Sequence, residues 1–305
     1  MGAVSSVLFA LLASHAVAAL PCELQVDVRG PGVPDEVVEE FRERVVERAD
    51  HVASRLGASA CAPVAITLVP AMEQAGTLDP PWHLPSWAAG AAQPAARRIV
   101  IGVTANRQIQ DRDQTLDHEL AHVFLHEAVA GAPMPRWFNE GVARVMASEH
   151  GVADLTLLAR ASLVDGLLPL GALREGFPAE PTRAALAYAQ AGRAVSLVEG
   201  AGHLPAVIAG LRAGASFEES LTSATGRATW QLDLDVQRSI PRWRALAIVG
   251  LETDFAMAAC AAVVIVAGTR ARRRLRERMA AMEDPTDGAF TSLIPVTRWT
   301  VPKRA

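Results

Sequence analysis

Hydrophobic and polar positions in the first third of the chain predict a small sheet and one covering helix. Polar and apolar residues alternate from Glu23 to Val28, and short apolar runs follow at 62–69 and 98–103. Each of these segments is typical of a strand. Between the first two, apolar residues recur at helical spacing from Val37 to Val52, and Asp35 is the predicted N-cap of that helix.

The rest of the body is predicted to be mostly helical. Residues 76–97 are rich in Pro, Gly and Trp and are predicted to form a long loop. Because strands come first and helices follow, the order favours an α+β fold with a small N-terminal sheet and a helical C-terminal part. Helices are predicted from Asp113 or Thr115 to about Ala130, at 138–149 and over most of 153–239.

The N-terminal segment is short and apolar. Its first fifteen residues hold no charged side chain, Val4–Ala13 forms an apolar core, and small residues follow from Ala16 to Ala19. This arrangement resembles a secretory signal peptide over residues 1–19, although no Lys or Arg precedes the apolar core. The alternative is a helix buried in the body, because short apolar runs are ambiguous.

A second apolar segment lies near the C-terminus. Residues 255–268 are uncharged, and an extension back to Ala245 gives a stretch that includes Glu252 and Asp254. Since a span needs about 20 residues, we predict a transmembrane helix at 245–268. Six arginines follow, and by the positive-inside rule residues 269–305 form a basic cytoplasmic tail. This topology predicts a single-pass protein of the cell membrane with its body outside the cytoplasm. The alternatives are a buried core helix and an amphipathic surface helix.

Composition and charge exclude several classes of protein. Half of the 305 residues are hydrophobic and a fifth are charged, which excludes a disordered chain and a protein with many membrane spans. The formal net charge of −4 gives no general attraction to nucleic acid. Three Cys are too few for a cysteine-built metal site, although Cys22 and Cys61 could form a disulfide in an exported body.

Residues 117–122 read D-H-E-L-A-H and contain the pattern H-E-x-x-H. His118 and His122 lie about one turn apart on one face of a helix, so both imidazoles can bind one metal ion. Zn²⁺ accepts such nitrogen ligands in a tetrahedral arrangement. Glu119 lies on another part of the helix surface and can reach a water molecule on that ion. The alternative is a pair of solvated or core histidines on an amphipathic helix.

Glu140 is the candidate third ligand. It lies in the segment P-R-W-F-N-E-G-V-A at 135–143, and seventeen residues separate it from His122. That length allows one helix to end and a second to lie beside it, and Gly141 would permit a close approach of the two. Catalytic zinc sites commonly use three protein ligands and leave a fourth position for water. The alternative is a solvated carboxylate near a helix N-terminus.

The motifs HELAH and PRWFNEGVA resemble those of the gluzincin metallopeptidases, and most closely the peptidase MA-like families of exported or membrane-anchored bacterial proteins. The resemblance covers roughly residues 85–240. It implies a zincin-like metallopeptidase domain at 20–243, with strand 98–103 along the cleft that holds an extended substrate. It also implies one Zn²⁺ ion, with the following residues in its site: His118, His122 and Glu140 as ligands and Glu119 as the catalytic glutamate.

Several further positions bear on this resemblance. Tyr188 lies in the A-Y-A-Q motif at 187–190, and related gluzincins use a Tyr or His to stabilise the oxyanion, so Tyr188 is the candidate for that role or else a core Tyr. Arg144 stands where thermolysin-like enzymes carry an Asp that supports a ligand histidine, which leaves the groups behind the ligands unassigned. Ala191 replaces the Ser often seen after A-Y-A-Q. His126 lies too far along the helix to be a ligand, and we expect it to be a supporting or surface residue.

The sequence therefore predicts a membrane-anchored zinc metallopeptidase that hydrolyses peptide bonds with a metal-activated water and Glu119 as general base. Two other functions are compatible with the same residues. One is a catalytically silent zincin-like binding module anchored in the membrane. The other is an exported structural or interaction protein in which H-E-x-x-H is accidental. Trp82, His83 and Trp87 either line the cleft or belong to a packed surface loop.

Overall fold

In the computed structural model of the chain, the described residues are 26–58, 62–82, 84, 88–104, 109–240, 245 and 253–282. The chain divides into two compact units, Met1–Leu246 and Ala247–Ala305. The first unit contains a sheet and most of the helices, and the second contains one long helix. The predicted signal peptide and the predicted pairing of Cys22 with Cys61 lie outside the described residues.

Four strands form one sheet in the first unit: β1 (Val26–Arg29), β2 (Val64–Val69), β3 (Gly90–Gln93) and β4 (Arg98–Gly102). Their order in the sheet is β1-β2-β4-β3. The pairs β1–β2 and β2–β4 are parallel, and β3 runs antiparallel to β4. The register aligns Val28 with Ile66 and Ile66 with Ile99. Strand β4 therefore lies inside the sheet, and β3 is an edge strand.

Two long helices, α1 (Asp35–Leu56) and α2 (Ile109–Ala128), pack together and against one face of the sheet. Alternate strand residues such as Ile66 and Ile101 join the buried side chains of both helices in the main core, as expected when successive side chains point to opposite faces. Val100 points to the other face and joins a smaller cluster with Met72 and Trp82. The sheet is thus covered on both faces, and α2 is held firmly against it.

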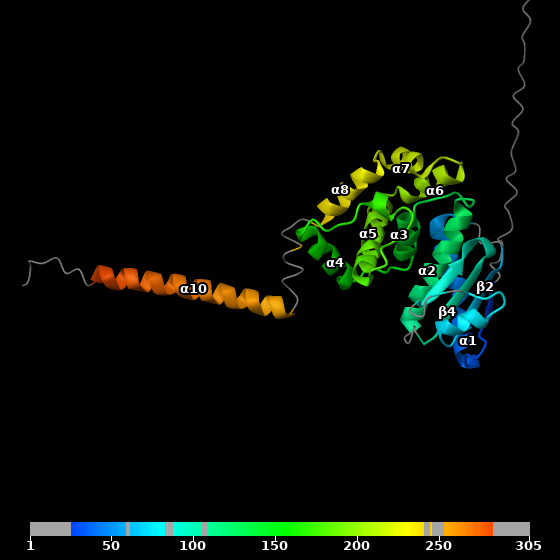
Figure 1. Cartoon of the computed structure of the whole chain (residues 1–305), viewed down its shortest axis with the longest axis horizontal. Helices are drawn as coiled ribbons and strands as arrows, with labels where there is room; N and C mark the ends of the chain where they lie inside the picture. The colour runs from blue at the N-terminus through cyan, green and yellow to red at the C-terminus, as the bar shows by residue number, and fades with distance from the viewer. Residues whose placement is uncertain are drawn as a thin grey trace, which may run out of the picture. The chain divides into compact units, whose positions relative to one another are not determined.

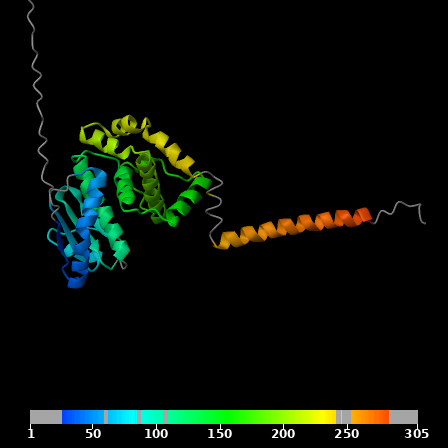
Figure 2. The same cartoon turned by 180° about the vertical axis from the view of Figure 1, so that it is seen from behind.

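The remainder of the first unit is helical. Helix α3 packs between α2 and α5, so the second half of the unit is joined to the sheet through α2 and α3 (Figures 1 and 2). Local sequence signals support several boundaries, such as the capping box in which Ser216 and Glu219 satisfy the first turn of α7. The helices are α3 (Arg136–Met146), α4 (Val152–Leu163), α5 (Pro181–Gly200), α6 (Leu204–Arg212), α7 (Phe217–Thr225) and α8 (Thr229–Ser239).

The described part of the second unit is the helix α10 (Thr253–Met282). This helix continues without a break past Gly268, through the arginine cluster, to Met282. Residues 246–252 of the predicted span lie outside the described residues. Within the described part of the chain, no single helix is both long and apolar enough to cross a membrane. In that part, only the helices α5 and α6 taken as one bent pair have sufficient length and apolar composition.

The predicted α+β class is confirmed, because a small sheet precedes a mostly helical remainder. The predicted loop at 76–97 is partly wrong, since it contains β3, the end of the 3₁₀ helix η1 (Met72–Thr77) and the whole of the 3₁₀ helix η2 (Pro94–Ala96). Residues 90–93 read G-A-A-Q and lack the β-branched or aromatic residues typical of strands, so pairing with β4 sets their conformation. Asp35 is also not a cap, because Pro34 occupies the N-cap position and Asp35 is the first helical residue.

Candidate metal centre

The H-E-x-x-H segment lies in the middle of α2, where its apolar side chains fix the helix. Leu116, Leu120 and Phe124 are fully buried against the sheet and α1. His118 and His122 lie on another part of the helix surface and line a cavity, with their side chains 16% and 12% exposed. Their ring centroids are 4.9 Å apart, as expected for residues one turn apart on one face. Burial of the apolar residues therefore sets the direction of both imidazoles.

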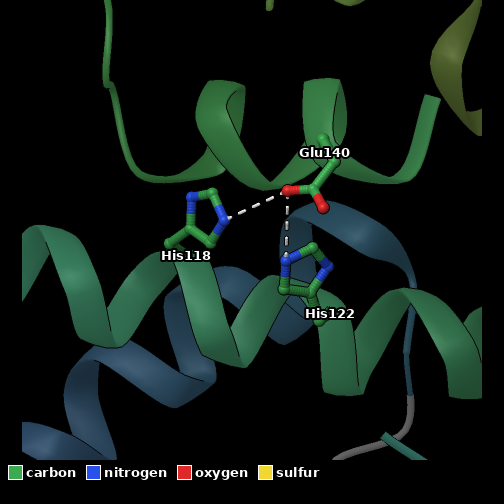
Figure 3. Close-up of side chains that lie close together, drawn as sticks. All are labelled: His118, His122 and Glu140. Atoms are coloured by element: carbon green, nitrogen blue, oxygen red, sulfur yellow. Dashed lines mark ion pairs between the residues drawn. The ribbon is translucent and has the colours of Figure 1, made fainter. Parts of the chain in front are cut away.

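Helix α3 brings Glu140 to the two histidines, as Figure 3 shows. Oε2 of Glu140 lies 3.6 Å from Nε2 of His118 and 3.8 Å from Nε2 of His122. Ligands at about 2.0–2.1 Å from a tetrahedral zinc ion lie about 3.3 Å from one another, so the observed spacings are close to those of a zinc site. One potential ligand atom from each of the three residues lies within 4.8 Å of the others. Two imidazole nitrogens and one carboxylate oxygen also form a donor set that suits zinc.

Gly141 fixes the position of α3, although not against the helix that the sequence indicated. We expected Gly141 to permit a close approach between α3 and α2. A Cβ atom at this position would instead lie 2.5 Å from the backbone oxygen of Ala191 and 2.6 Å from Val195 Cγ2, both on α5. The absence of a side chain therefore lets α3 lie directly on α5, with Glu140 directed away from that contact toward α2.

Each of the two histidines is also held through its second ring nitrogen. Nδ1 of His118 lies 3.1 Å from Oε1 of Glu149, and Nδ1 of His122 lies 3.1 Å from Oδ1 of Asn139. A carboxylate and an amide oxygen only accept hydrogen bonds, so each Nδ1 carries the proton and donates it. This arrangement leaves Nε2 of each neutral imidazole with a lone pair for a metal ion. The sequence analysis missed both supporting residues. Asn139 could have been suspected from its place beside Glu140, whereas no local signal indicated Glu149.

Arg144 supports Glu149 rather than a histidine. Its guanidinium donates to the backbone oxygen of Glu149 at 2.7 Å and to Oδ2 of Asp154 at 2.6 Å, and it lies 3.5 Å from Oε2 of Glu149. The departure from the thermolysin-like pattern thus has a structural explanation. The carboxylate that supports His118 comes from beyond the end of α3, and Arg144 holds that carboxylate in place.

Glu119 is buried beside the same cavity, with only 7% of its surface exposed. Burial raises the pKa of its carboxyl group, the positive charge of His118 opposes that effect, and the two neighbouring carboxylates add to it, so the pKa is about 7. Gly90 of β3 lies directly over this side chain, because a Cβ atom there would be 3.1 Å from Glu119 and 2.7 Å from Thr115 Cγ2. A carboxyl group with a pKa near neutrality can both accept and donate a proton.

The ligand residues carry opposing charges in the absence of a metal ion. Burial lowers the pKa of His118, but hydrogen bonds to Glu140 and Glu149 outweigh it and raise the pKa to about 10. Burial and the neighbouring charge of His118 lower the pKa of His122. Burial raises the pKa of Glu140, and the two histidines and Arg136 more than offset this, so its pKa is lowered. His118 is therefore protonated at neutral pH, and its positive charge lies between two carboxylates at a place that a metal ion could also occupy.

Tyr188 of α5 lines the cavity, with its ring edge-to-face against Phe177 at 4.7 Å between centroids. Burial raises the pKa of its hydroxyl group, with a further contribution from the negative charge of Glu140, while Arg136 opposes the shift. The hydroxyl group is therefore protonated at neutral pH and can donate a hydrogen bond. His126 lies outside the His118–His122–Glu140 cluster, near the end of α2 beside Gly131.

The cavity at the metal centre has a volume of about 670 Å³, which is in the range of ligand-binding sites. One wall is the edge strand β3 with its neighbours Leu84, Ala88, Ala89 and Pro94. The expectation that strand 98–103 lies along the cleft is wrong, because β4 is paired on both sides and β3 stands between it and the cavity. Trp82 does not line the cleft either. It is buried in the smaller core under the guanidinium of Arg98, while His83 and Trp87 lie outside the described residues.

The small sheet, the long helix with two histidines and the glutamate on the next helix together define a zincin-like, peptidase-type protein. A family model agrees with this class. The model for the Peptidase MA superfamily matches residues 49–242, and the chain belongs to that superfamily. The matched residues contain α2, α3 and α5, which are the helices that carry the cluster and Tyr188. No curated protein matches the chain.

Proposed function

We propose that this protein is a zinc-dependent metallopeptidase of the gluzincin type, with His118, His122 and Glu140 as the metal ligands. The observation that carries the proposal is the convergence of these three side chains, within 4.8 Å of one another, beside the buried carboxyl group of Glu119. An accidental H-E-x-x-H would not require a carboxylate from another helix to meet both imidazoles, nor a hydrogen-bonded acceptor behind each of them.

His118, His122 and Glu140 would hold the zinc ion, which would supply Lewis acidity and an activated water at neutral pH. Glu119 accepts the proton of the attacking water and then delivers it to the leaving amine nitrogen. In the metal-free protein its pKa is about 7, a value at which a carboxyl group can both accept and donate a proton. The Tyr188 hydroxyl group donates a hydrogen bond to the carbonyl oxygen of the substrate as negative charge develops there.

The proposed substrate is a peptide bound in extended conformation along β3. This strand is the edge of the sheet next to the cavity, and among the described residues no further strand pairs with its outer side. A peptide can add to such an edge through main-chain hydrogen bonds. Gly90 supports this placement, because the absence of a side chain there lets the Glu119 side chain lie directly against the strand.

Replacement of the general base tests this proposal. We expect the zinc-loaded full-length chain to cleave members of a mixed peptide library, detected by mass spectrometry. Glu119→Gln should keep the zinc and lose cleavage by a factor on the order of 10² or more. Glu175→Gln, which changes an exposed glutamate outside the site, serves as the control. Cleavage by Glu119→Gln at the wild-type rate would contradict the mechanism. Bound zinc without any cleavage by the wild type would favour the catalytically silent binding module.

We also propose that residues 245–268 anchor the chain in the cell membrane and that the body lies outside the cytoplasm. The apolar run at 255–268 and the arginines directly after it support this topology. The side chains of Val263, Val264 and Ile265 on α10 are all more than half exposed. Carbonate extraction of membranes tests the anchor, and release of the protein into the soluble fraction would contradict it.

A further inference from the structure

A second cavity, of about 560 Å³, is lined by residues of α5, α7 and α8 and shares no lining residue with the candidate metal centre. Its volume is within the usual range for small-molecule sites. One part of its lining is apolar. The other part is polar and contains three arginine side chains. The apolar wall is formed by Leu197, Val198, Ala201, Leu221 and Leu232.

Arg193 of α5 is the central cation of this second cavity. Its Nε donates to the Ser239 hydroxyl oxygen at 2.9 Å, and that hydroxyl group donates in turn to the backbone oxygen of Val236 at 2.7 Å. Within the described part of the chain, Arg193 forms no ion pair with a carboxylate. Burial lowers the pKa of its guanidinium, which reflects the cost of removing this charge from water. The hydrogen bond through Nε leaves the two terminal nitrogens as a parallel pair of donors.

The other charges in this cavity do not neutralise Arg193. Arg227 forms an ion pair with Asp235, and Arg238 lies 3.8 Å from the same carboxylate. Asp235 is the single acidic residue among those that line the cavity, whereas three arginines line it. Asp235 is thus already shared between two of them. The cavity therefore has an excess of positive charge that an anionic ligand would balance.

The geometry points to a binding site for a small amphiphilic carboxylate, with its head group on Arg193 and its apolar body against Leu197, Leu221 and Leu232. A planar carboxylate matches two parallel guanidinium donors, and such bidentate pairs are among the strongest polar contacts in proteins. The apolar wall requires a hydrocarbon body rather than a simple inorganic anion. This site is independent of the proposed peptidase activity, because it needs neither a metal ion nor a substrate.

Isothermal titration calorimetry of the full-length chain tests the site with three probes that share one chain length. Sodium octanoate carries the carboxylate, 1-octanol replaces it with a neutral group, and octyl phosphate offers a different anion. We expect saturable binding of octanoate, binding of octanol at least tenfold weaker, and no advantage for octyl phosphate. Arg193→Gln should weaken octanoate binding at least tenfold, and Arg193→Lys should restore only part of it because Lys lacks the paired donors.

Arg183→Gln provides the matched control, because it removes an exposed guanidinium from the same helix outside the cavity. It should bind octanoate as the wild type does. Thermal melting of each variant verifies that the fold is intact. Absence of saturable octanoate binding by the wild type would overturn the proposal. Equal affinity for octanoate and octanol, or an Arg193→Gln variant that is folded and binds normally, would overturn it as well. Stronger binding of octyl phosphate than of octanoate would reject the carboxylate as the preferred head group.

Discussion

Glu149 accepts a hydrogen bond from Nδ1 of His118 across 3.1 Å, although the two residues are 31 positions apart in the chain. Burial raises the pKa of Glu149, but its contacts with His118 and Arg144 outweigh this and lower it, so the carboxylate is charged at neutral pH. A charged acceptor at this place fixes the ring of His118 and makes its Nε2 a better donor to a metal ion.

Loss of this carboxylate should weaken metal binding without unfolding the protein. Glu149→Ala removes the acceptor behind His118, so the ring can rotate and the affinity for zinc should fall about 10- to 100-fold. Competition with a chromophoric chelator measures the affinity, and Glu175→Ala is the control at an exposed position. An unchanged zinc affinity in Glu149→Ala would show that the hydrogen bond has no part in holding the metal.

A methyl group at Gly141 should disturb the contact between α3 and α5. The Cβ atom of Gly141→Ala would lie 2.5 Å from a backbone oxygen that cannot move independently of α5. Such overpacking typically costs about 1–3 kcal/mol in the free energy of unfolding. Denaturant titration measures this loss. Gly200→Ala, where no heavy atom lies within 4 Å, should show none. Equal stability of the two variants would disprove the close approach.

Zinc binding should release a proton from His118. In the metal-free protein its pKa is about 10, so the ring is protonated at pH 7–8, whereas a ligand imidazole must be neutral at Nε2. The affinity for zinc should therefore rise with pH throughout the range below about 10. Calorimetric titrations with zinc in buffers of different ionisation enthalpy count the protons released. A count of zero at pH 7.5 would contradict the charged state of His118.

Tyr188 can be tested by removal of its hydroxyl group alone. Tyr188→Phe keeps the ring that packs against Phe177, so the fold should be preserved. If the hydroxyl group stabilises the developing oxyanion, kcat should fall on the order of 10²-fold with little change in KM. Steady-state kinetics on a cleaved peptide separate the two constants. A variant with wild-type kcat would reduce Tyr188 to a packing residue of the cavity wall.

The sequence located the candidate ligands because their chemistry is encoded at fixed helical spacing. His118 and His122 must share a face once α2 forms, and Glu140 lies in a motif that is specific by itself. The mostly helical α+β class also followed from local periodicity. The contacts between helices were harder to predict. Glu149 reaches His118 only because α3 lies across α2, and Gly141 faces α5 rather than α2.

The conformation of strand β3 was also hard to predict from its own residues. Residues 90–93 have no intrinsic preference for a strand, and only their pairing with β4 makes them one. The resemblance to the gluzincins implies instead that the strongly apolar segment at 98–103 lies along the cleft. The structure places that segment inside the sheet, and the weakly patterned strand takes the position next to Glu119. The apolar patterns of β2 and β4 indicate strands, whereas the residues of β3 are all only partly buried and carry no such pattern.

Metal content tests the central claim most directly. After dialysis against metal-free buffer, the purified full-length chain should retain one zinc ion per molecule by elemental mass spectrometry. His122→Ala and Glu140→Ala should each retain less than about a tenth of that amount, because two ligands hold zinc far more weakly than three. Glu175→Ala should match the wild type. A wild-type chain that binds no zinc, or ligand variants that hold as much as the wild type, would contradict the account.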